Sequence, residues 1–397
     1  MSSTIQDVMG LMAPMIQWFA RIPELRATYG REVCDFAAGN PQEGTIRGYA
    51  QAVTRWVEAQ EPDWFAYKTS EPKAQAVVAA SLRAYLGIPF HPEDIALTNA
   101  SIAALAATLR TICEPGDEVI IVSPPHFLYE PLIRAAGAST VRVKVAPRTF
   151  DLDVEAVAGA LTPRTRAMII NTPHNPTGRI FPPEALQRLT DVLTEASERH
   201  QPIYLLSDEA YNRILFDGRR FTSPAAYYVR TFLIYSYGKV LLAPGQRIGY
   251  IAVHPGMPER DVFRVALMAG QLATGYAWPN ALLQHALADL DPLTVDVGRI
   301  QTRRDRMIEA LRGFGYEVHV PEATFYLMPR CPILDDAVFC EWLAEEKIIA
   351  MPGAFLDLPG YFRLSLTATD TMIERSLPGF ARAMARATTS SQPPGRT

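Results

Sequence analysis

The sequence predicts an α/β fold in which a large domain contains a mostly parallel sheet and a smaller domain is α+β. Three observations support this prediction. Short β-branched apolar runs recur through the middle of the chain, helix-like segments separate them, and 397 residues suffice for two domains. The runs are continuously apolar, which is typical of strands in a sheet covered by helices on both faces.

The expected strands of the large domain each end at a proline, a glycine or a polar residue. They are DEVIIVSPP (117–125), AMIINTPHNPTG (167–178), PIYLLSDEAY (202–211), TFLIYSYGK (231–239) and RIGYIAVHP (247–255). Helix-like segments lie between several of these runs, namely EPLIRAAG (130–137), DVEAVAGAL (153–161) and PPEALQRLTDVLTEASERH (182–200). This alternation is the pattern of a doubly covered parallel sheet.

The C-terminal part mixes strands and helices and predicts the smaller domain. Its expected strands are YEVHVPEATFYLMP (316–329), KIIAMPG (347–353) and YFRLSL (361–366), and its expected helices are DDAVFCEWLAEE (335–346) and TMIERSLPGFARAMARA (371–387). Long helices at 257–270, 282–290 and 299–315 are expected to bridge the two domains.

We therefore expect four parts along the chain. Residues 1–45 join the small domain, 46–285 form the large domain, 286–388 form the C-terminal small domain, and 389–397 are a disordered tail. The apolar, amphipathic stretch at 12–25 is expected to pack against the small domain or a partner, and it could instead cover the site as a lid.

The composition excludes several classes of protein. Lys plus Arg is 38 and Asp plus Glu is 42, so the net charge of 38 − 42 = −4 disfavours a nucleic-acid or anionic membrane surface. No apolar run reaches the length of about 18 residues that a membrane span needs. The four cysteines form no Cys-x-x-Cys pair or zinc spacing, and the N-terminus lacks a basic secretory region. A cytoplasmic protein without a metal site is expected.

Polar residues cluster where the expected strands end at their carboxyl side. They are His126, Asn175, Asp208, Ser236 and Lys239. In an open parallel sheet this edge is where ligands bind, so the pattern predicts a site there.

The stretch around Lys239 indicates an anion-binding site beside a reactive amine. The Ser236 hydroxyl and the Arg247 guanidinium are suited to a phosphate, and a helix that begins near Ala100 and Ser101 would add free backbone N–H groups. An amine beside a buried strand is partly desolvated, which favours its neutral, nucleophilic form. Taken singly, Ser236 could instead cap a strand, Arg247 could form a surface ion pair, and Lys239 could be an ordinary solvated lysine.

Asp208 leaves an apolar strand, where a carboxylate needs a partner such as a protonated ring nitrogen. It could instead cap the next helix. Tyr211 lies three residues later and could reach the same site. Asn175 lies between Pro173 and Pro176 in a rigid turn, which either presents the amide to a ligand or is a plain Asn-Pro turn. The chain has no G-x-G-x-x-G after a strand, P-loop, His-Glu-x-x-His or G-x-S-x-G motif, which disfavours nicotinamide, metal and hydrolase chemistry.

Together, NPTG, SDEAY and Ser-x-x-Lys with an arginine eight residues after the lysine resemble the class I/II aminotransferases, a family of fold-type I pyridoxal-phosphate enzymes. The resemblance extends from Phe36 to Leu366 and implies a seven-stranded type of sheet. It implies that Lys239 forms the internal aldimine, that Asp208 and Tyr211 act with it in catalysis, and that Arg363, Asn175 and Gly39 contact the substrate. The implied cofactor contacts are Ala100, Ser101, His126, Asn175, Asp208, Tyr211, Ser236, Lys239 and Arg247, with Tyr67 from the neighbouring subunit of a homodimer.

Three positions depart from the family pattern. Ala100 replaces the usual glycine at the phosphate turn, which is harmless at negative φ and strained at positive φ. His126 occupies the place of the ring-stacking aromatic, with Phe127 as the alternative if the register slips by one. Glu71-Pro72 stands near where a glycine is common.

The resemblance implies a ping-pong transfer of an amino group between an L-amino acid and a 2-oxo acid. A pyridoxal-phosphate lyase, racemase or oxidising or cyclising biosynthetic enzyme would keep the same residues and remains an alternative. A non-catalytic regulator is disfavoured because the chain has no spare length for a DNA-binding module. The sequence leaves open which amino acid is used.

Overall fold

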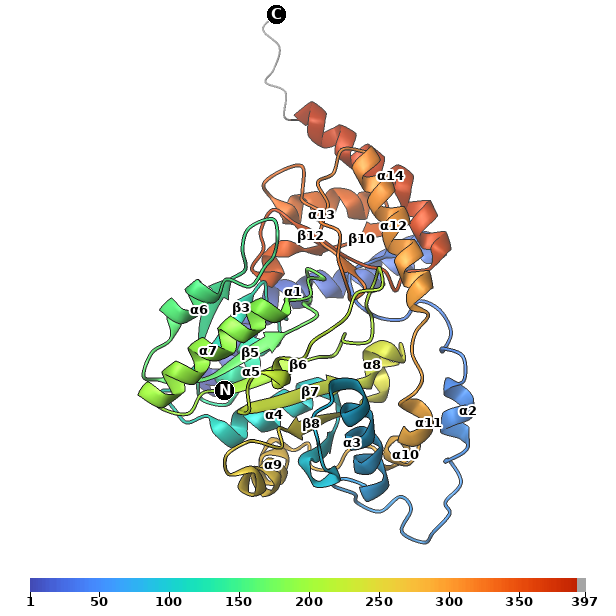
Figure 1. Cartoon of the computed structure of the whole chain (residues 1–397). Coiled ribbons are helices and arrows are strands. Elements are labelled where there is room, and N and C mark those ends of the chain that lie inside the picture. The colour runs from blue at the N-terminus through green and yellow to red at the C-terminus, as the bar shows by residue number, and fades with distance from the viewer. Residues whose placement is uncertain (391–397) are drawn as a thin grey trace, which may run out of the picture.

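The structure, a computed structural model, describes residues 1–390, and its centre is one seven-stranded sheet (Figure 1). The strands, in sheet order, are β2 (Ile95–Thr98), β8 (Gly249–Val253), β7 (Thr231–Ser236), β6 (Tyr204–Asp208), β5 (Thr165–Asn171), β3 (Glu118–Ser123) and β4 (Ser139–Lys144). All neighbouring pairs are parallel except those made by β8, which runs antiparallel to both β2 and β7. The predicted mostly parallel sheet is confirmed.

Helices cover both faces of this sheet because alternate residues of its strands point in opposite directions. In β3, Val119 and Ile121 belong to a core shared with α4, α5 and α9, whereas Ile120 and Val122 belong to a core shared with α6 and α7. The helices around the sheet are α2 (Tyr49–Thr54), α3 (Pro72–Leu86), α4 (Ala100–Ile112), α5 (Tyr129–Ala135), α6 (Val154–Ala160), α7 (Pro183–Arg199), α8 (Tyr237–Val240), α9 (Arg260–Thr274), α10 (Ala281–His285) and α11 (Leu287–Leu290).

The smaller domain has two short sheets under three helices, which confirms the predicted α+β unit (Figure 1). Its elements are α12 (Val297–Gly313), β9 (Tyr326–Leu327), α13 (Asp336–Glu345), β10 (Ile348–Ile349), β11 (Met351–Pro352), β12 (Phe362–Ser365) and α14 (Asp370–Ser390). The antiparallel order is β11-β12-β9. A continuous hydrophobic core joins Tyr235 and Tyr250 of the large sheet to Phe325 and Phe362 of this domain.

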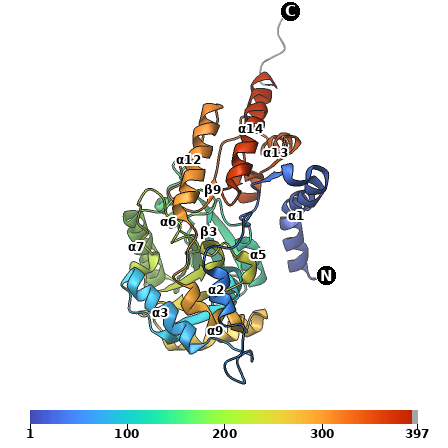
Figure 2. The same ribbon diagram turned by 90° about the vertical axis from the view of Figure 1, so that its right-hand side faces the viewer.

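The N-terminal segment packs on the small domain and also reaches the large one. β1 (Cys34–Asp35) pairs in parallel with β10. α1 (Ser3–Tyr29) is fixed by the buried indole N–H of Trp18, which donates to the Ala350 carbonyl at 3.0 Å. Figure 2 shows α1 beside the C-terminal helices and extending toward α5, with which it is in contact. The long helix continues through Pro14 and Pro23, both of which face solvent.

Three expected elements differ from the structure. The strand expected at 347–353 is divided into β10 and β11, which belong to different sheets. Within 316–329 only Tyr326–Leu327 form a strand, because Pro321 lacks an N–H for pairing and Thr324 has a left-handed φ of 69°. The helix expected at 282–290 is divided into α10 and α11. Of the expected tail, α14 includes residues 389 and 390, and 391–397 lie outside the described residues.

None of the helices within residues 1–390 combines the length and apolarity that a membrane crossing needs. The same described residues contain no group of three or more His, Cys, Asp or Glu side chains placed to hold a metal ion.

Candidate active site

A cavity lies at the carboxyl edge of the large sheet, where β5, β6 and β7 end. Its walls bring together most of the site residues expected from the sequence, which were spread over nearly 150 positions. They include Ser101, His126, Asn175, Asp208, Tyr211, Ser236, Lys239 and Arg247, and the remaining lining residues are Ile102, Tyr129, Asn171, Ala210, Gly238 and Pro244.

Lys239 enters this cavity from the short helix α8, directly after β7. Ser236 caps that helix, since its hydroxyl accepts from the Gly238 N–H at 3.4 Å. Gly238 permits a close approach of the next turn, because a Cβ there would lie 2.9 Å from the Pro244 Cα. The Lys239 amine is 5.7 Å from the Tyr211 ring centre, and it forms no ion pair with any carboxylate in residues 1–390.

The Arg247 guanidinium is held by backbone groups. It donates to the Pro244 carbonyl at 2.7 Å and to the Asn99 carbonyl at 3.4 Å, and no described carboxylate pairs with it. Burial lowers the pKa of Arg247, although a guanidinium stays charged at any neutral pH. Its net positive charge is therefore uncompensated beside Ser236 and Ser101. The surface ion pair considered for Arg247 is not formed.

Ala100 begins α4 with a left-handed φ of 68°, and its side chain is buried. Because φ is positive at this position, alanine in place of the usual glycine strains the backbone. The neighbouring strand approaches closely because Gly249 has no side chain: a Cβ there would lie 2.9 Å from the Ala100 Cα. The turn carries the first free N–H groups of a 13-residue helix, with Ser101 in the cavity wall.

Asp208 ends β6 and is held by groups from neighbouring elements. The Tyr129 hydroxyl donates to its carboxylate at 2.7 Å, and the Asn171 amide donates to its carbonyl at 2.8 Å. Burial raises the pKa of Asp208, while the hydrogen bond from Tyr129 and the charge of Lys239 limit the rise. Its carboxylate also accepts weakly from the Ala210 N–H at 3.4 Å, but a turn and no helix follows β6, so Asp208 is not a helix cap.

Arg363, from β12, lies beside Asn175 and Tyr211. It donates to the Asn175 side-chain oxygen at 3.3 Å and to the Ala37 carbonyl at 3.0 Å. The Asn175 amide in turn faces the Tyr211 hydroxyl at 3.5 Å. The Nε of Arg363 is buried without a hydrogen-bond partner, which is costly and indicates a place for an anionic acceptor.

His126 and Phe127 stack on each other, with ring centres 4.6 Å apart, and of the two only His126 reaches the cavity that contains Lys239. His126 borders the cavity that contains Lys239, whereas Phe127 lines the adjoining one. Burial, with the charges of Lys239 and Arg363, lowers the pKa of His126 to about 3. The imidazole is therefore neutral at physiological pH and can present a flat, uncharged face.

Four expected residues are not in the cavity wall: Ala100 and Arg363, described above, and Tyr67 and Gly39. Tyr67 is 86% exposed on the surface, where its ring packs on Trp278. Gly39 lies against Tyr326, since a Cβ at Gly39 would be 2.3 Å from the Tyr326 hydroxyl.

Sequence reasoning assigned no role to Tyr129, Asn171 and Tyr326. Asn171 ends β5, so the rule that linked the other strand ends could have found it. Tyr326 had no such signal. Its hydroxyl accepts from Tyr211 at 3.4 Å, and the Arg363 guanidinium lies 4.2 Å from its ring centre. Burial opposes its ionisation, but the charges of Lys239 and Arg363 outweigh burial and lower the pKa of Tyr326.

Comparison with known proteins agrees with this arrangement over almost the whole chain. Residues 31–378 match the sequence profile of the family described as aminotransferase class I and II. The chain is 31% identical over 381 residues to the aspartate/prephenate aminotransferase of Thermus thermophilus, covering 93% of this chain and 95% of that protein. It is 27% identical to the aspartate aminotransferase of Rhizobium meliloti, covering 90% of each.

Solved structures of similar proteins have the same fold. An aminotransferase from Eubacterium rectale superposes with a TM-score of 0.91 at 26% identity, covering 97% of this chain and 98% of that one. The N-succinyldiaminopimelate aminotransferase of Mycobacterium tuberculosis superposes with a TM-score of 0.82 at 26% identity, covering 94% and 99%. The chain therefore belongs to the class I and II aminotransferase family, and it is a pyridoxal-phosphate-dependent aminotransferase of fold type I.

Proposed function

We propose that Lys239 is the amine that holds the cofactor and moves the proton during a ping-pong transfer between an L-amino acid and a 2-oxo acid. The observation that carries this proposal is the convergence of Lys239, Asp208 and Arg247 in one cavity, with the unpartnered Nε of Arg363 buried nearby. These four groups come from separate elements, and only the fold brings them together.

The residues present fit pyridoxal phosphate. Arg247, Ser236 and the N-terminus of α4 at Ser101 offer a cation, a hydroxyl and free N–H groups to a phosphate. Asp208 offers a buried carboxylate to a protonated ring nitrogen. The neutral His126 offers a flat face for stacking, with Ala210 also in the cavity wall. Asn175 and Tyr211 would contact the ring hydroxyl.

When bound, pyridoxal phosphate supplies an aldehyde that links reversibly to amines and a conjugated ring that accepts electrons. Arg363 would bind the substrate α-carboxylate, because its Nε has no partner and its other nitrogens are already fixed on Asn175 and Ala37. This fixed guanidinium would orient the bonds at the substrate Cα.

Lys239 would then take the proton from the substrate Cα and later return one, because its amine has no carboxylate partner to hold it away. Asp208 would keep the ring nitrogen protonated, and the hydrogen bond from Tyr129 would keep the carboxylate ionised and correctly placed. Gly39 would contact the substrate through its backbone, while its missing side chain leaves room for the Tyr326 hydroxyl. The alternative lyase, racemase and oxidising or cyclising activities are not favoured, since the relatives compared are aminotransferases.

We also propose that the protein works in the cytoplasm as a homodimer with shared sites. Tyr67 and Trp278 form an aromatic pair that is 86% and 51% exposed in the single chain, which is unusual for large apolar rings. A partner subunit would cover this pair and receive the Tyr67 hydroxyl at its phosphate site.

The proposed division of the chain stays as residues 1–45 with the small domain, 46–285 as the large domain and 286–388 as the small domain. The pairing of β1 with β10 and the Trp18 hydrogen bond to Ala350 support the first assignment.

Borohydride reduction of the holoenzyme, followed by peptide mapping, tests the role of Lys239. We expect a pyridoxyl adduct on Lys239, and we expect Lys239→Ala to lose that adduct and nearly all turnover. Lys144→Ala, which removes an exposed lysine of β4, is the matched control and should retain both. A wild-type rate in Lys239→Ala would falsify the proposal.

A further inference from the structure

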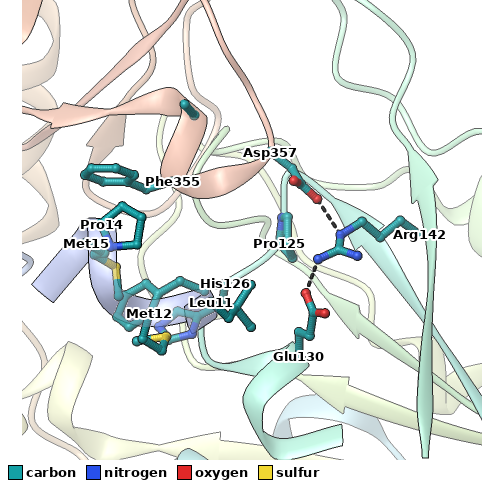
Figure 3. A pocket seen from close by; sticks show the side chains of 12 residues that line it. Leu11, Met12, Pro14, Met15, Pro125, His126, Glu130, Arg142, Phe355 and Asp357 are labelled. Atoms are coloured by element: carbon teal, nitrogen blue, oxygen red, sulfur yellow. Dashed lines mark hydrogen bonds and ion pairs between the residues drawn. The ribbon is translucent and has the colours of Figure 1, made fainter. Parts of the chain in front are cut away.

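A second cavity of about 170 Å³ adjoins the Lys239 cavity and shares His126 as a wall. It lies where three parts of the chain meet: α1, the loop that carries His126, and the turn Gly353–Leu356 that follows β11 (Figure 3). β11 pairs with β12 so that Met351 is opposite Arg363. The cavity is therefore placed between the ring-stacking position and the strand pair that carries the carboxylate-binding arginine.

Most of its walls are apolar. α1 contributes Met12 and Met15, the loop contributes Phe127, and the turn after β11 contributes Phe355. Figure 3 shows the α1 side chains and Phe355 on one side and a charged group on the other. Methionine and aromatic side chains adapt to apolar ligands of varied shape, so this is a surface suited to hydrocarbon.

The single cation among the lining residues is Arg142, and it is already paired with two carboxylates. Its Nε pairs with the Asp357 carboxylate at 2.6 Å, and its Nη2 pairs with the Glu130 carboxylate (Figure 3). Asp357 also accepts from the Ser123 hydroxyl at 3.1 Å. The lining thus contains two carboxylates and one guanidinium, which leaves no free cation for an incoming anion.

We propose that this cavity receives the side chain of the amino-acid substrate and selects large apolar side chains, aliphatic or aromatic, over dicarboxylates. A side-chain carboxylate would lose its hydration between methionine and phenylalanine walls, and the only lining cation, Arg142, is already paired with Asp357 and Glu130. An apolar side chain would gain from the same walls. The inference rests on the proposed function, and it separates this chain from relatives named aspartate aminotransferases.

The first experiment compares amino donors with the purified holoenzyme and one common 2-oxo acid. We expect kcat/KM for leucine, methionine and phenylalanine to exceed that for aspartate and glutamate by about tenfold or more, as a well-fitted apolar pocket provides. Alanine serves as the internal reference, because its methyl group is too short to fill the cavity.

The second experiment changes the walls. Phe355→Ala should lower kcat/KM for phenylalanine and leucine by about tenfold and leave alanine unchanged. Ile16→Ala is the matched control, since Ile16 neighbours Met15 on α1 but is 59% exposed and outside the cavity. It should leave all donors unchanged.

Asp357→Asn tests the charge argument in the opposite direction. Asparagine also tolerates the left-handed φ of 58° at this position and can still accept from Ser123. With one of its two carboxylates neutralised, Arg142 has less of its charge compensated, so kcat/KM for glutamate relative to leucine should rise several-fold. An unchanged ratio would contradict the role given to Arg142.

The outcomes separate this inference from the proposed function. If aspartate or glutamate is the best donor, or if Phe355→Ala slows alanine as much as phenylalanine, the side-chain pocket is wrong while aminotransfer stands. If alanine and every other donor fail to convert the cofactor, the result contradicts the proposed roles of the site residues themselves and not only the side-chain pocket.

Discussion

The backbone of Ala100 is strained at the point where α4 begins. Its φ of 68° lies in the left-handed region, which disfavours any residue with a Cβ. We expect Ala100→Gly to raise the free energy of unfolding by about 1 kcal/mol, because relief of strain outweighs the extra freedom of the unfolded chain. Chemical denaturation of the holoenzyme measures this, with Ala103→Gly, inside the same helix, expected to destabilise instead. Equal effects of the two changes would show that position 100 is unstrained.

Glu209 is a fully buried acid that follows Asp208 in the chain. Burial raises its pKa from 4.5 to about 7, although Ser223, Ser207 and Asn212 all donate to its carboxylate. The folded chain then holds this proton more tightly than the unfolded chain does. Its contribution to stability is complete below about pH 4.5 and is lost as the pH rises toward about 7.

Glu209→Gln removes this dependence, because an amide does not titrate. We expect the variant to gain thermal stability relative to wild type between pH 5 and 8, by about 1 to 3 kcal/mol at the upper end. Melting temperatures across that range, at fixed protein and cofactor concentrations, measure the difference. A difference that stays constant with pH would mean that Glu209 does not titrate in this window.

At the scale of single residues, much of the candidate site could be predicted because its chemistry lies at strand ends. Lys239, Asp208 and Asn175 each follow an apolar run, and such positions meet at one edge of a parallel sheet. Tyr326 could not be found in this way. It stands inside an ordinary apolar stretch, and only the tertiary contact with Tyr211 and Arg363 distinguishes it.

At the scale of elements, the sequence predicted well those long segments in which apolar residues recur with one clear period or form one continuous run. The expected helices at 182–200 and 299–315 match α7 and α12, and the five apolar runs match five strands of the sheet. The short strands of the small domain were overestimated, because alternation of apolar residues does not reveal where a turn such as that at Thr324 interrupts pairing. The length of α1 was hidden by its two prolines.

α1 is fixed by two buried side chains, Met15 and Trp18, of which Trp18 also makes a hydrogen bond. Trp18 donates to the Ala350 carbonyl and packs its ring 6.5 Å from that of Phe355. We expect Trp18→Ala to cost about 3 kcal/mol locally and to release α1 without unfolding the large sheet. Hydrogen exchange should then speed up in residues 3–29 and in the turn 353–356. Exchange in β5, β6 and β7 should stay at the wild-type rate, and faster exchange there would mean that α1 supports the whole fold.

At the scale of the whole molecule, the fold class and the covering of both sheet faces could be predicted because they follow from the order of runs along the chain. The quaternary arrangement could not, since it depends on which exposed surfaces meet. Tyr67 and Trp278 are the residues through which the proposed dimer can be tested.

Subunit mixing tests whether the sites are shared. Lys239→Ala and Tyr67→Phe should each be impaired as homodimers. A hybrid dimer should contain one intact site, because Tyr67 of one subunit would serve the Lys239 cavity of the other. Random exchange of equal amounts should restore about a quarter of wild-type activity. If the mixture is no more active than the average of its parents, Tyr67 acts within its own subunit or not at all.

Arg363 stands on β12 and Phe355 on the turn after its neighbour β11, whereas Lys239 and Asp208 stand in the large domain. The small domain would thus contact both the α-carboxylate and the side chain of a substrate, and the large domain would hold the reactive groups. A substrate would then have to satisfy residues of both domains at once. A change in the small domain alone would therefore alter which amino acids the enzyme accepts and leave the reactive groups in place.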